Sequence, residues 1–280
     1  MYRWIFLGLI LLVSIDRTYG DEPLVLGVHP YLPPIELIER FTPLAKYLER
    51  ELDQPVVVRV GTSYKSHNDS ISRGGVDLAF IGPANYVRLR LDGYEFHEAL
   101  RLGFSGKTRF RGAIITSNTS GIERLDQVKD HRMALGDPNS TLSTLVPLHM
   151  LSEAGVDIFS LGKRKHLRNH HNVALGILVG KYDIGGVKEE VYREFESRGL
   201  VRIAYTEWFP SHLFVVNPSL PAEVRSRIRA ALLNLANEEG GVKILARIKK
   251  GTTELVDNND HEFDSLMEIV RQSRNKKWLE

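Results

Sequence analysis

The stretch GDPNSTLSTLVP, from Gly136 to Pro147, gathers side chains that could bind an anion. It reads as the end of a strand, a polar loop and the start of an apolar helix. Ser140, Thr141 and Ser143 lie where the first backbone amides of that helix have no internal acceptor. These amides and the helix dipole attract negative charge, and hydroxyl groups add neutral donors. From the residues alone, helix capping is the more common role of such Ser and Thr residues, and a site for a tetrahedral oxyanion is the alternative.

The other polar residues favour binding over catalysis. The sequence has no Gly-x-Ser-x-Gly turn, no phosphate-loop lysine pattern and no zinc-binding helix motif. His166, His170 and His171 lie close together but lack the acidic or cysteine partners of a zinc site. Ser140 near a histidine could act as a nucleophile, but the same pair binds an anion without reaction. We therefore expect no enzymatic activity, no metal and no cofactor.

The charge of the chain gives no reason to expect a nucleic-acid partner. Its 37 Lys and Arg residues balance 35 Asp and Glu residues, which leaves a formal net charge of +2. The basic run at residues 163–168 is typical of a solvated surface. Arg109 and Arg111 could offer charge to an anion, but exposed arginines are the common case. Trp208 and Phe209 are expected to pack in the core.

The first twenty residues read as a secretory signal peptide. Arg3 precedes an apolar run from Trp4 to Val13, and polar residues and Gly20 follow. The run is shorter than the roughly 20 residues of a membrane-spanning helix, although an N-terminal anchor remains the alternative. The chain has no cysteine, which excludes a lipid-modified cysteine after the signal. We therefore expect export to the periplasm, with cleavage after Gly20.

The elements that must position the polar loop alternate between strands and helices. Apolar, β-branched runs predict strands at 24–28, within 55–61 and within 76–83. A helical period covers 35–54, where Pro43 is expected at a helix start or a break. This order predicts a parallel sheet with helices on its faces.

The pattern restarts after about residue 110. Strands are predicted within 111–117, 132–137 and 201–205, and helices within 121–129, 141–155, 171–182 and 220–240. Two similar units, with a return of the chain to the first, predict an α/β protein with two lobes and a hinged cleft between them.

Five segments, in order, resemble the phosphonate-, phosphate- and phosphite-type periplasmic solute-binding proteins of ABC importers. They are PYLPP with FTPLAKYLERELDQPVVV, TSYKSHNDSISRGGVDLAFIGPANYV, SGIERLDQVKDHRMALGDPNST, GDPNST followed by LVP, and HHNVALGILVGKYDIGGVKEE. The resemblance implies the two-lobed type II periplasmic-binding-protein fold, with a mostly parallel sheet and flanking helices in each lobe and the ligand in the cleft. It divides the chain into a signal peptide (1–20), lobe 1 (21–108), lobe 2 (109–203) and a return to lobe 1 with C-terminal helices (204–280).

The resemblance also implies which residues bind the ligand. Ser140 and Thr141 match the family's oxyanion-binding Ser-Thr pair. His170 matches its histidine, with His171 as the alternative if the register slips by one. Tyr64 matches a tyrosine that lines the cleft from the first lobe.

Further candidate ligand-binding residues lie where this chain departs from the family pattern. The family usually has Ser and Gly after the Ser-Thr pair, where this chain has Leu142 and Ser143, and Ser143 could compensate from another angle. A usual tyrosine is replaced by Phe110. Tyr86 is a weaker candidate for the first-lobe wall. Two lost donors at about 1–3 kcal/mol each would weaken binding by roughly several hundredfold.

The implied function is a receptor that captures a small phosphorus oxyanion (phosphonate, phosphite or phosphate-like) by hinge closure and delivers it to the permease of an ABC importer. The departures at Leu142 and Phe110 keep two alternatives open. One is a receptor that signals to a membrane sensor kinase, and the other is a related fold with a changed or lost ligand. We expect a periplasmic monomer with no nucleic-acid partner.

Overall fold

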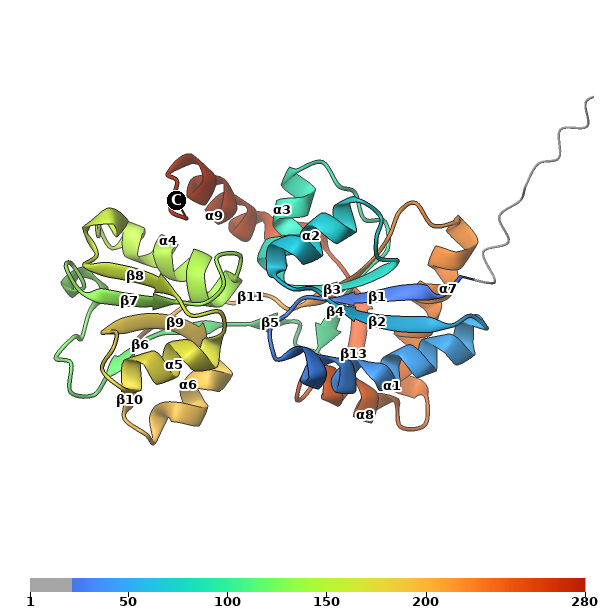
Figure 1. Ribbon diagram of the computed structural model, residues 1–280, viewed down its shortest axis with the longest axis horizontal. Coiled ribbons are helices and arrows are strands. Elements are labelled where there is room, and N and C mark those ends of the chain that lie inside the picture. The colour runs from blue at the N-terminus through green and yellow to red at the C-terminus, as the bar shows by residue number, and fades with distance from the viewer. Residues whose placement is uncertain (1–21, 280) are drawn as a thin grey trace, which may run out of the picture.

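Two lobes, each built on its own sheet, lie side by side along the long axis of the molecule (Figure 1). This computed structural model describes residues 22–279. The predicted signal peptide at residues 1–20 lies outside the described residues. The two-lobed α/β fold is confirmed.

Lobe 1 contains a six-stranded sheet in the order β13-β4-β12-β3-β1-β2. As predicted, β1 pairs in parallel with both β2 and β3. The returning strands pair antiparallel, so the sheet is mixed rather than mostly parallel. The strands are β1 (Leu24–Val28), β2 (Val56–Val60), β3 (Leu78–Ile81), β4 (Ala99–Gly103), β12 (Leu213–Val216) and β13 (Glu254–Asp257).

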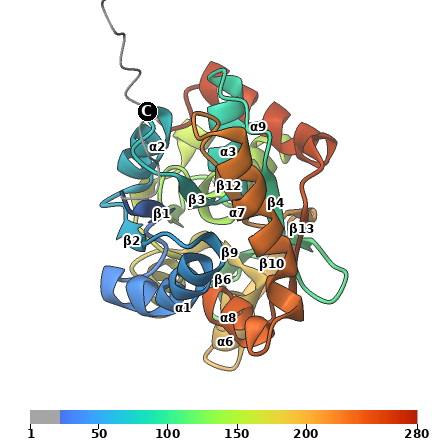
Figure 2. The same cartoon turned by 90° about the vertical axis from the view of Figure 1, so that its right-hand side faces the viewer.

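Helices cover both faces of the lobe 1 sheet: α2 and α3 lie on one side and α1 and α8 on the other (Figures 1 and 2). The α-helices are α1 (Pro34–Leu52), α2 (Tyr64–Ser72), α3 (Pro83–Leu91), α7 (Ala222–Asn234), α8 (Gly241–Ile248) and α9 (Asp264–Asn275). The short 3₁₀ turns are η4 (Leu235–Asn237) and η5 (Asp260–Phe263).

Pro43 lies inside α1 and does not start or break it, so that prediction is wrong. A proline inside a helix removes one backbone hydrogen bond. The helix continues because its apolar face is buried in the lobe 1 core, where Phe41, Leu44 and Leu48 are almost inaccessible to solvent. Burial of several large side chains, at about 1.5–3 kcal/mol each, outweighs the missing bond.

Lobe 2 contains a five-stranded mixed sheet in the order β10-β6-β9-β7-β8. Helix α4 lies on one face, and α5 and α6 lie on the other (Figure 1). Residues 121–129, where a helix was expected, form only the 3₁₀ turn η1 (Leu125–Gln127). The remaining elements are β6 (Gly112–Ser117), β7 (Arg132–Leu135), η2 (Thr141–Leu145, a π-helical turn), α4 (Val146–Glu153), η3 (Ile158–Ser160), β8 (Lys163–His166), α5 (His170–Leu178), β9 (Ile184–Lys188), α6 (Glu189–Glu196) and β10 (Leu200–Tyr205).

The chain crosses between the lobes along two short strands, β5 (Arg109–Phe110) and β11 (Phe209–Pro210), which pair antiparallel. A third link is the C-terminal segment: Trp278 is buried, and its carbonyl accepts a hydrogen bond from Arg164 of lobe 2. The lobe boundaries drawn at residues 108 and 203 remain predictions.

The lobes are in direct contact around the cleft. One core cluster joins Ile81 and Val87 of lobe 1 to Leu142 and Leu148 of lobe 2. The backbone N–H of Ala84 in α3 donates to the Thr141 hydroxyl of lobe 2 over 3.0 Å. The structure is therefore a closed arrangement. Within residues 22–279, no helix has the length and apolar character needed to cross a membrane.

Candidate anion-binding site

A small cavity lies between the lobes, where strand ends of both sheets meet. In lobe 1, His29 follows β1 and His212 precedes β12, which runs antiparallel to β3. In lobe 2, Lys188 ends β9 and residues 139–141 follow β7. Open α/β sheets bind ligands at the carboxyl ends of their strands, so the cavity lies where the topology favours a ligand. Its lining residues are His29, Tyr64, Gly82, Phe110, Asn139, Ser140, Thr141, Leu142, His170, Lys188 and His212.

Four of the predicted ligand-binding residues line this cavity: Tyr64, Ser140, Thr141 and His170. Ser143 is buried behind the loop and does not line it. Its hydroxyl donates to the Ser140 hydroxyl over 2.8 Å. Ser143 therefore acts on the cavity through the orientation of Ser140.

Tyr86 lies away from the cavity, contrary to the prediction for it. Its hydroxyl donates to Asp260 over 2.6 Å, and its ring packs on Phe263. The cause is its position on α3, on the face that packs against the C-terminal segment rather than toward lobe 2. Tyr86 thus helps to hold the C-terminal segment on lobe 1.

The loop after β7 approaches the start of the next helix closely. Gly136 makes this possible, since a Cβ atom there would lie only 1.9 Å from the Ser143 hydroxyl oxygen. Ser140 precedes the helical turn, but neither its hydroxyl nor any other side chain caps the helix. Thr141 uses its hydroxyl as the acceptor for Ala84. Capping alone therefore does not explain the hydroxyl groups of this loop.

The first amides of this helix have no acceptor among the described residues. Leu145 N–H bonds to the Ser140 carbonyl, which closes the wide π-helical turn. The N–H groups of residues 141–143 precede that bond and make no hydrogen bond to a residue outside η2 within residues 22–279. Unsatisfied amides at a helix start, next to a cavity, are an arrangement that binds anions.

His170, the first residue of α5, presents a donor to the same cavity. Its Nδ1 accepts a hydrogen bond from the backbone N–H of Lys188 over 3.1 Å. Burial, followed by repulsion from Lys188, lowers the pKa of His170 well below its usual range, so the ring is neutral. A neutral ring whose Nδ1 accepts must carry its proton on Nε2. His170 can therefore donate from Nε2 to an anion.

Lys188 brings a positive charge into the cavity. Burial, followed by repulsion from Lys249, lowers the pKa of Lys188 to about 8, so the ammonium group is still mostly charged at pH 7. Within the described residues, no carboxylate lies within ion-pair distance of it, and no Asp or Glu lines the cavity. A partly buried cation without a paired carboxylate favours an anionic ligand.

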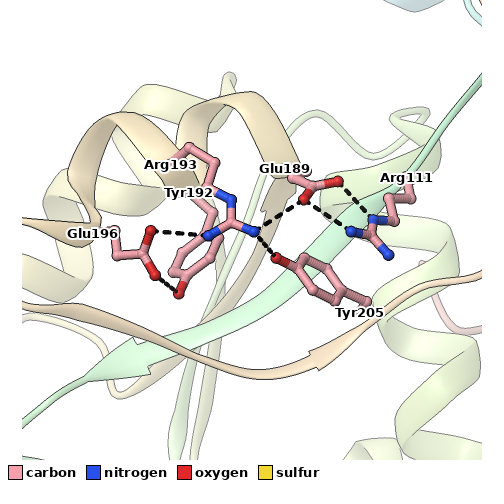
Figure 3. A network of polar contacts seen from close by, with 6 residues as sticks. All are labelled: Arg111, Glu189, Tyr192, Arg193, Glu196 and Tyr205. Atoms are coloured by element: carbon pink, nitrogen blue, oxygen red, sulfur yellow. Dashed lines mark hydrogen bonds and ion pairs between the residues drawn. The ribbon is translucent and has the colours of Figure 1, made fainter.

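A network of charged residues fixes the backbone next to Lys188 (Figure 3). Glu189, which starts α6, accepts two hydrogen bonds from Arg111, at 2.6 and 3.0 Å. The Arg111 guanidinium also lies over the ring of Tyr205, 3.8 Å from its centroid. Arg193 bonds to both Glu189 and Tyr205. Arg111 therefore positions the end of β9 and does not itself line the cavity.

The lobe 1 wall consists of aromatic rings. His29 stacks on His212 with ring centroids 5.3 Å apart and meets Tyr64 edge-on. Burial, followed by repulsion from His67, lowers the pKa of His29 to about 3, and its Nδ1 donates to the Phe80 carbonyl. The Nε2 atom of His29 is then an acceptor, and it has no partner within residues 22–279. This nitrogen can accept a hydrogen bond from a protonated oxygen of a ligand.

Other sequence candidates have structural roles. Arg109 pairs with Glu262 at the crossing strands. Phe209 is buried as expected, but Trp208 is 48% exposed, so its expected core position is wrong. Trp208 remains at the surface because it covers the Arg111 guanidinium from outside. In residues 22–279, no cluster of three His, Cys, Asp or Glu side chains could hold a metal ion.

Sequence reasoning missed His29, Lys188 and His212 as cavity residues. A signal exists for two of them, since VLGVH and IGGVK each place a polar residue directly after an apolar run. Such residues lie at the carboxyl ends of strands, where ligands bind. His212 carries no such signal, because its position depends on the antiparallel pairing of β12 with β3.

A family model described as the periplasmic substrate-binding protein of phosphonate ABC transporters matches residues 26–263. The probable ABC transporter phosphite-binding protein PhnD1 of Prochlorococcus marinus (strain MIT 9301) is 24% identical over 164 residues. That match spans 56% of this chain and 54%, about half, of the relative. The phosphate-import protein PhnD of Mycolicibacterium smegmatis is 24% identical over 238 residues, 77% of this chain and 73% of that protein.

The fold is also similar to a solved structure. The structure of PhnD1 from Prochlorococcus marinus in complex with methylphosphonate aligns with a TM-score of 0.78 at 19% identity. The alignment covers 90% of this chain and 98% of that one. At this identity the likeness concerns the fold.

Proposed function

The chain belongs to the family of periplasmic substrate-binding proteins of phosphonate ABC transporters, and from this premise we propose that it captures a small phosphorus oxyanion between its lobes. The ligand class is a phosphonate, phosphite or phosphate-like anion, and the receiver is the permease of an ABC importer. The family consists of binding proteins, and we propose that this chain has no catalytic activity.

The observation that carries the proposal is the chemistry of the cavity. Open helix amides at residues 141 and 142, the Nε2–H donor of His170 and the charge of Lys188 converge on one space without a carboxylate. Donors fixed in this way stabilise an anion more strongly than mobile water does. The hydroxyl of Ser140 adds a further donor, because it already accepts from Ser143.

The two departures from the family pattern, Leu142 and Phe110, favour a ligand that has an apolar substituent on phosphorus. Leu142 and Phe110 both line the cavity. Each offers carbon where the family usually offers a hydroxyl group. The P–H bond of phosphite and the P–C bond of a phosphonate need no hydrogen-bond donor. The fourth oxygen of phosphate, placed against this wall, would be left without one. Phosphite and alkylphosphonates therefore fit this wall better than phosphate does.

Capture follows from the closed arrangement. Lobe 1 contributes Tyr64 and His29, and lobe 2 contributes the helix amides and His170. Only the closed form brings both sets to one ligand, so the ligand shifts the population toward closure by its differential affinity. We propose that the protein acts as a periplasmic monomer, exported by the signal peptide at residues 1–20.

The test compares two neighbouring histidines by calorimetric titration of the purified protein with methylphosphonate, phosphite, phosphate and sulfate. We expect the wild type to bind at least one phosphorus oxyanion with one site per chain. His170→Ala removes a hydrogen bond to a charged ligand, at about 1.5–3 kcal/mol, and so weakens binding by about 10- to 150-fold.

The matched control is His171→Ala, on the same helix but outside the oxyanion cavity. His171 pairs with Glu194 instead. Its loss is expected to leave affinity within about twofold. Equal losses for both variants, or no binding of any phosphorus oxyanion by the wild type, would contradict the proposal.

A further inference from the structure

A second, larger cavity adjoins the first and shares His170, Lys188 and His212 with it. It runs between the lobes from these residues to Tyr31 and Lys249. A ligand held in the oxyanion cavity therefore has room to extend past Lys188. The chemistry of this second wall indicates what the extension carries.

Most of the charged side chains that line the second cavity are cationic. Arg40, Lys188, Lys249 and Lys250 line it, against the single carboxylate of Glu190. Arg40 is already paired with Glu36, and Lys250 is exposed to solvent. Lys188 and Lys249 are thus the cations that face the space without a full partner of their own.

Lys249 is the more deeply buried of the two. Its side chain is only 10% exposed, and its ammonium nitrogen makes no hydrogen bond within residues 22–279. Its one ion-pair partner among the described residues, Glu190, lies at the long distance of 3.5 Å and is 64% exposed. The rings of Phe104 and Phe110, at 4.8 and 4.9 Å, stabilise the charge but accept none of its three N–H groups. A buried ammonium group without an acceptor is costly unless a ligand supplies one.

The charge of Lys249 acts on the oxyanion cavity. Besides burial, repulsion from Lys249 lowers the pKa values of Lys188, His170 and His212. Lys249 also lies over Phe110, which lines the first cavity. A ligand substituent that leaves the first cavity past Lys188 enters the second cavity, whose wall includes Lys249.

We propose that the ligand carries a second acidic group and is a phosphonocarboxylate, with its phosphonate in the first cavity and its carboxylate on Lys249. The inference rests on the proposed function and specifies the substituent of the phosphonate. The carbon next to phosphorus packs on Phe110, and the carboxylate supplies the acceptor that Lys249 lacks. An amine-bearing phosphonate would instead bring a third cation beside Lys188 and Lys249, with only the exposed Glu190 to offset it.

The experiment compares phosphonoacetate, ethylphosphonate and 2-aminoethylphosphonate by calorimetric titration of wild type and Lys249→Gln. These ligands share the phosphonate group and differ in the charge of the substituent. We expect the wild type to bind phosphonoacetate at least tenfold more tightly than ethylphosphonate, and 2-aminoethylphosphonate more weakly than either. Lys249→Gln is expected to remove the advantage of phosphonoacetate and to leave ethylphosphonate affinity within about threefold.

A second variant separates ligand binding from closure. Glu190→Gln removes the carboxylate nearest to Lys249 across the lobes. If Lys249 binds the ligand, Glu190→Gln keeps or strengthens phosphonoacetate binding, because a competing acceptor is gone. If Lys249 only locks the lobes through Glu190, both variants weaken all three ligands alike. Melting curves of both ligand-free variants check that they fold.

The outcomes distinguish this inference from the proposed function. Equal wild-type affinity for phosphonoacetate and ethylphosphonate, or equal losses for all ligands in Lys249→Gln, would overturn the inference and leave phosphonate capture standing. Failure of the wild type to bind any phosphonate, phosphite or phosphate would overturn the proposed function itself.

Discussion

Lys188 carries the positive charge of the oxyanion cavity, and this charge depends on pH near the physiological range. The titratable and charged groups around it include Lys249, Glu190, Arg40, His170 and His212. Its folded-state pKa of about 8 lies below the roughly 10.4 of an unfolded lysine. Between these values the unfolded chain binds more protons, so the contribution of Lys188 to the stability of the ligand-free protein rises with pH. The charge that attracts the ligand is lost over the same window.

Anion affinity is therefore expected to fall as the pH rises through about 8. Phosphite is the suitable probe, because its own ionisation is complete in this range. We predict that phosphite affinity of the wild type falls by about tenfold per pH unit above the pKa of Lys188, while ligand-free stability rises, as measured by titration calorimetry and denaturant unfolding.

The control for this prediction is Lys188→Met, which keeps an unbranched chain and removes the charge. It is expected to bind phosphite weakly at every pH and to lose the rise in stability that Lys188 causes. A variant whose affinity still falls with the wild-type slope would show that another group controls the pH dependence.

At the residue scale, sequence reasoning reached the part of the site that is local in the chain. Ser140, Thr141 and His170 belong to short segments whose residue types signal their chemistry. Lys188 lies between an apolar run and two glutamates, so its residue type alone does not distinguish a cavity residue from an exposed one. Lys249 directly follows α8, and only the closure of lobe 1 on lobe 2 brings it beside Glu190. Such contacts depend on topology and leave no local pattern.

At the scale of elements, the turn from β7 into α4 is the most constrained part of the site. Gly136 leaves room for Ser143, and Ser143 orients Ser140. The space is fully used, since an added Cβ would also lie 2.8 Å from the Cβ atom of Ser143. The turn therefore requires a residue without a Cβ atom at position 136.

We predict that Gly136→Ala destabilises the protein by about 1–3 kcal/mol, as expected for overpacking, and weakens oxyanion binding because the helix amides move. Denaturant unfolding and a methylphosphonate titration measure the two effects. Adding Ser143→Gly to the variant removes the clashing atoms and is expected to recover most of the stability. Unchanged stability of Gly136→Ala would contradict this account of the turn.

The same scale shows which elements could be predicted. The strands β1, β2 and β3 are apolar runs, and their parallel pairing was predicted from the alternation with helices. By contrast, β4 was not predicted, because the charged Arg101 interrupts its apolar residues. Arg101 is buried there only because Glu262, far along the chain, pairs with it at 2.6 Å. The sequence around Arg101 does not show that a distant glutamate balances its buried charge.

At the scale of the whole molecule, function depends on how the lobes meet. The crossing strands β5 and β11 allow the lobes to approach, and the contact between Ala84 and Thr141 closes the cleft beside the helix amides. The C-terminal segment adds a further contact through Trp278 and Arg164. The sequence predicted two lobes and a cleft, but the cations that line it come from both lobes and meet only on closure.

The most direct test of oxyanion capture is a crystal structure of the protein grown with methylphosphonate. We predict that the phosphorus lies in the cavity between the lobes, with its oxygens within hydrogen-bond distance of the amides of residues 141 and 142, His170 Nε2 and Lys188 Nζ, and its methyl group against Phe110. A closed protein with methylphosphonate bound elsewhere, or with ordered water in place of the anion at saturating ligand, would contradict the account.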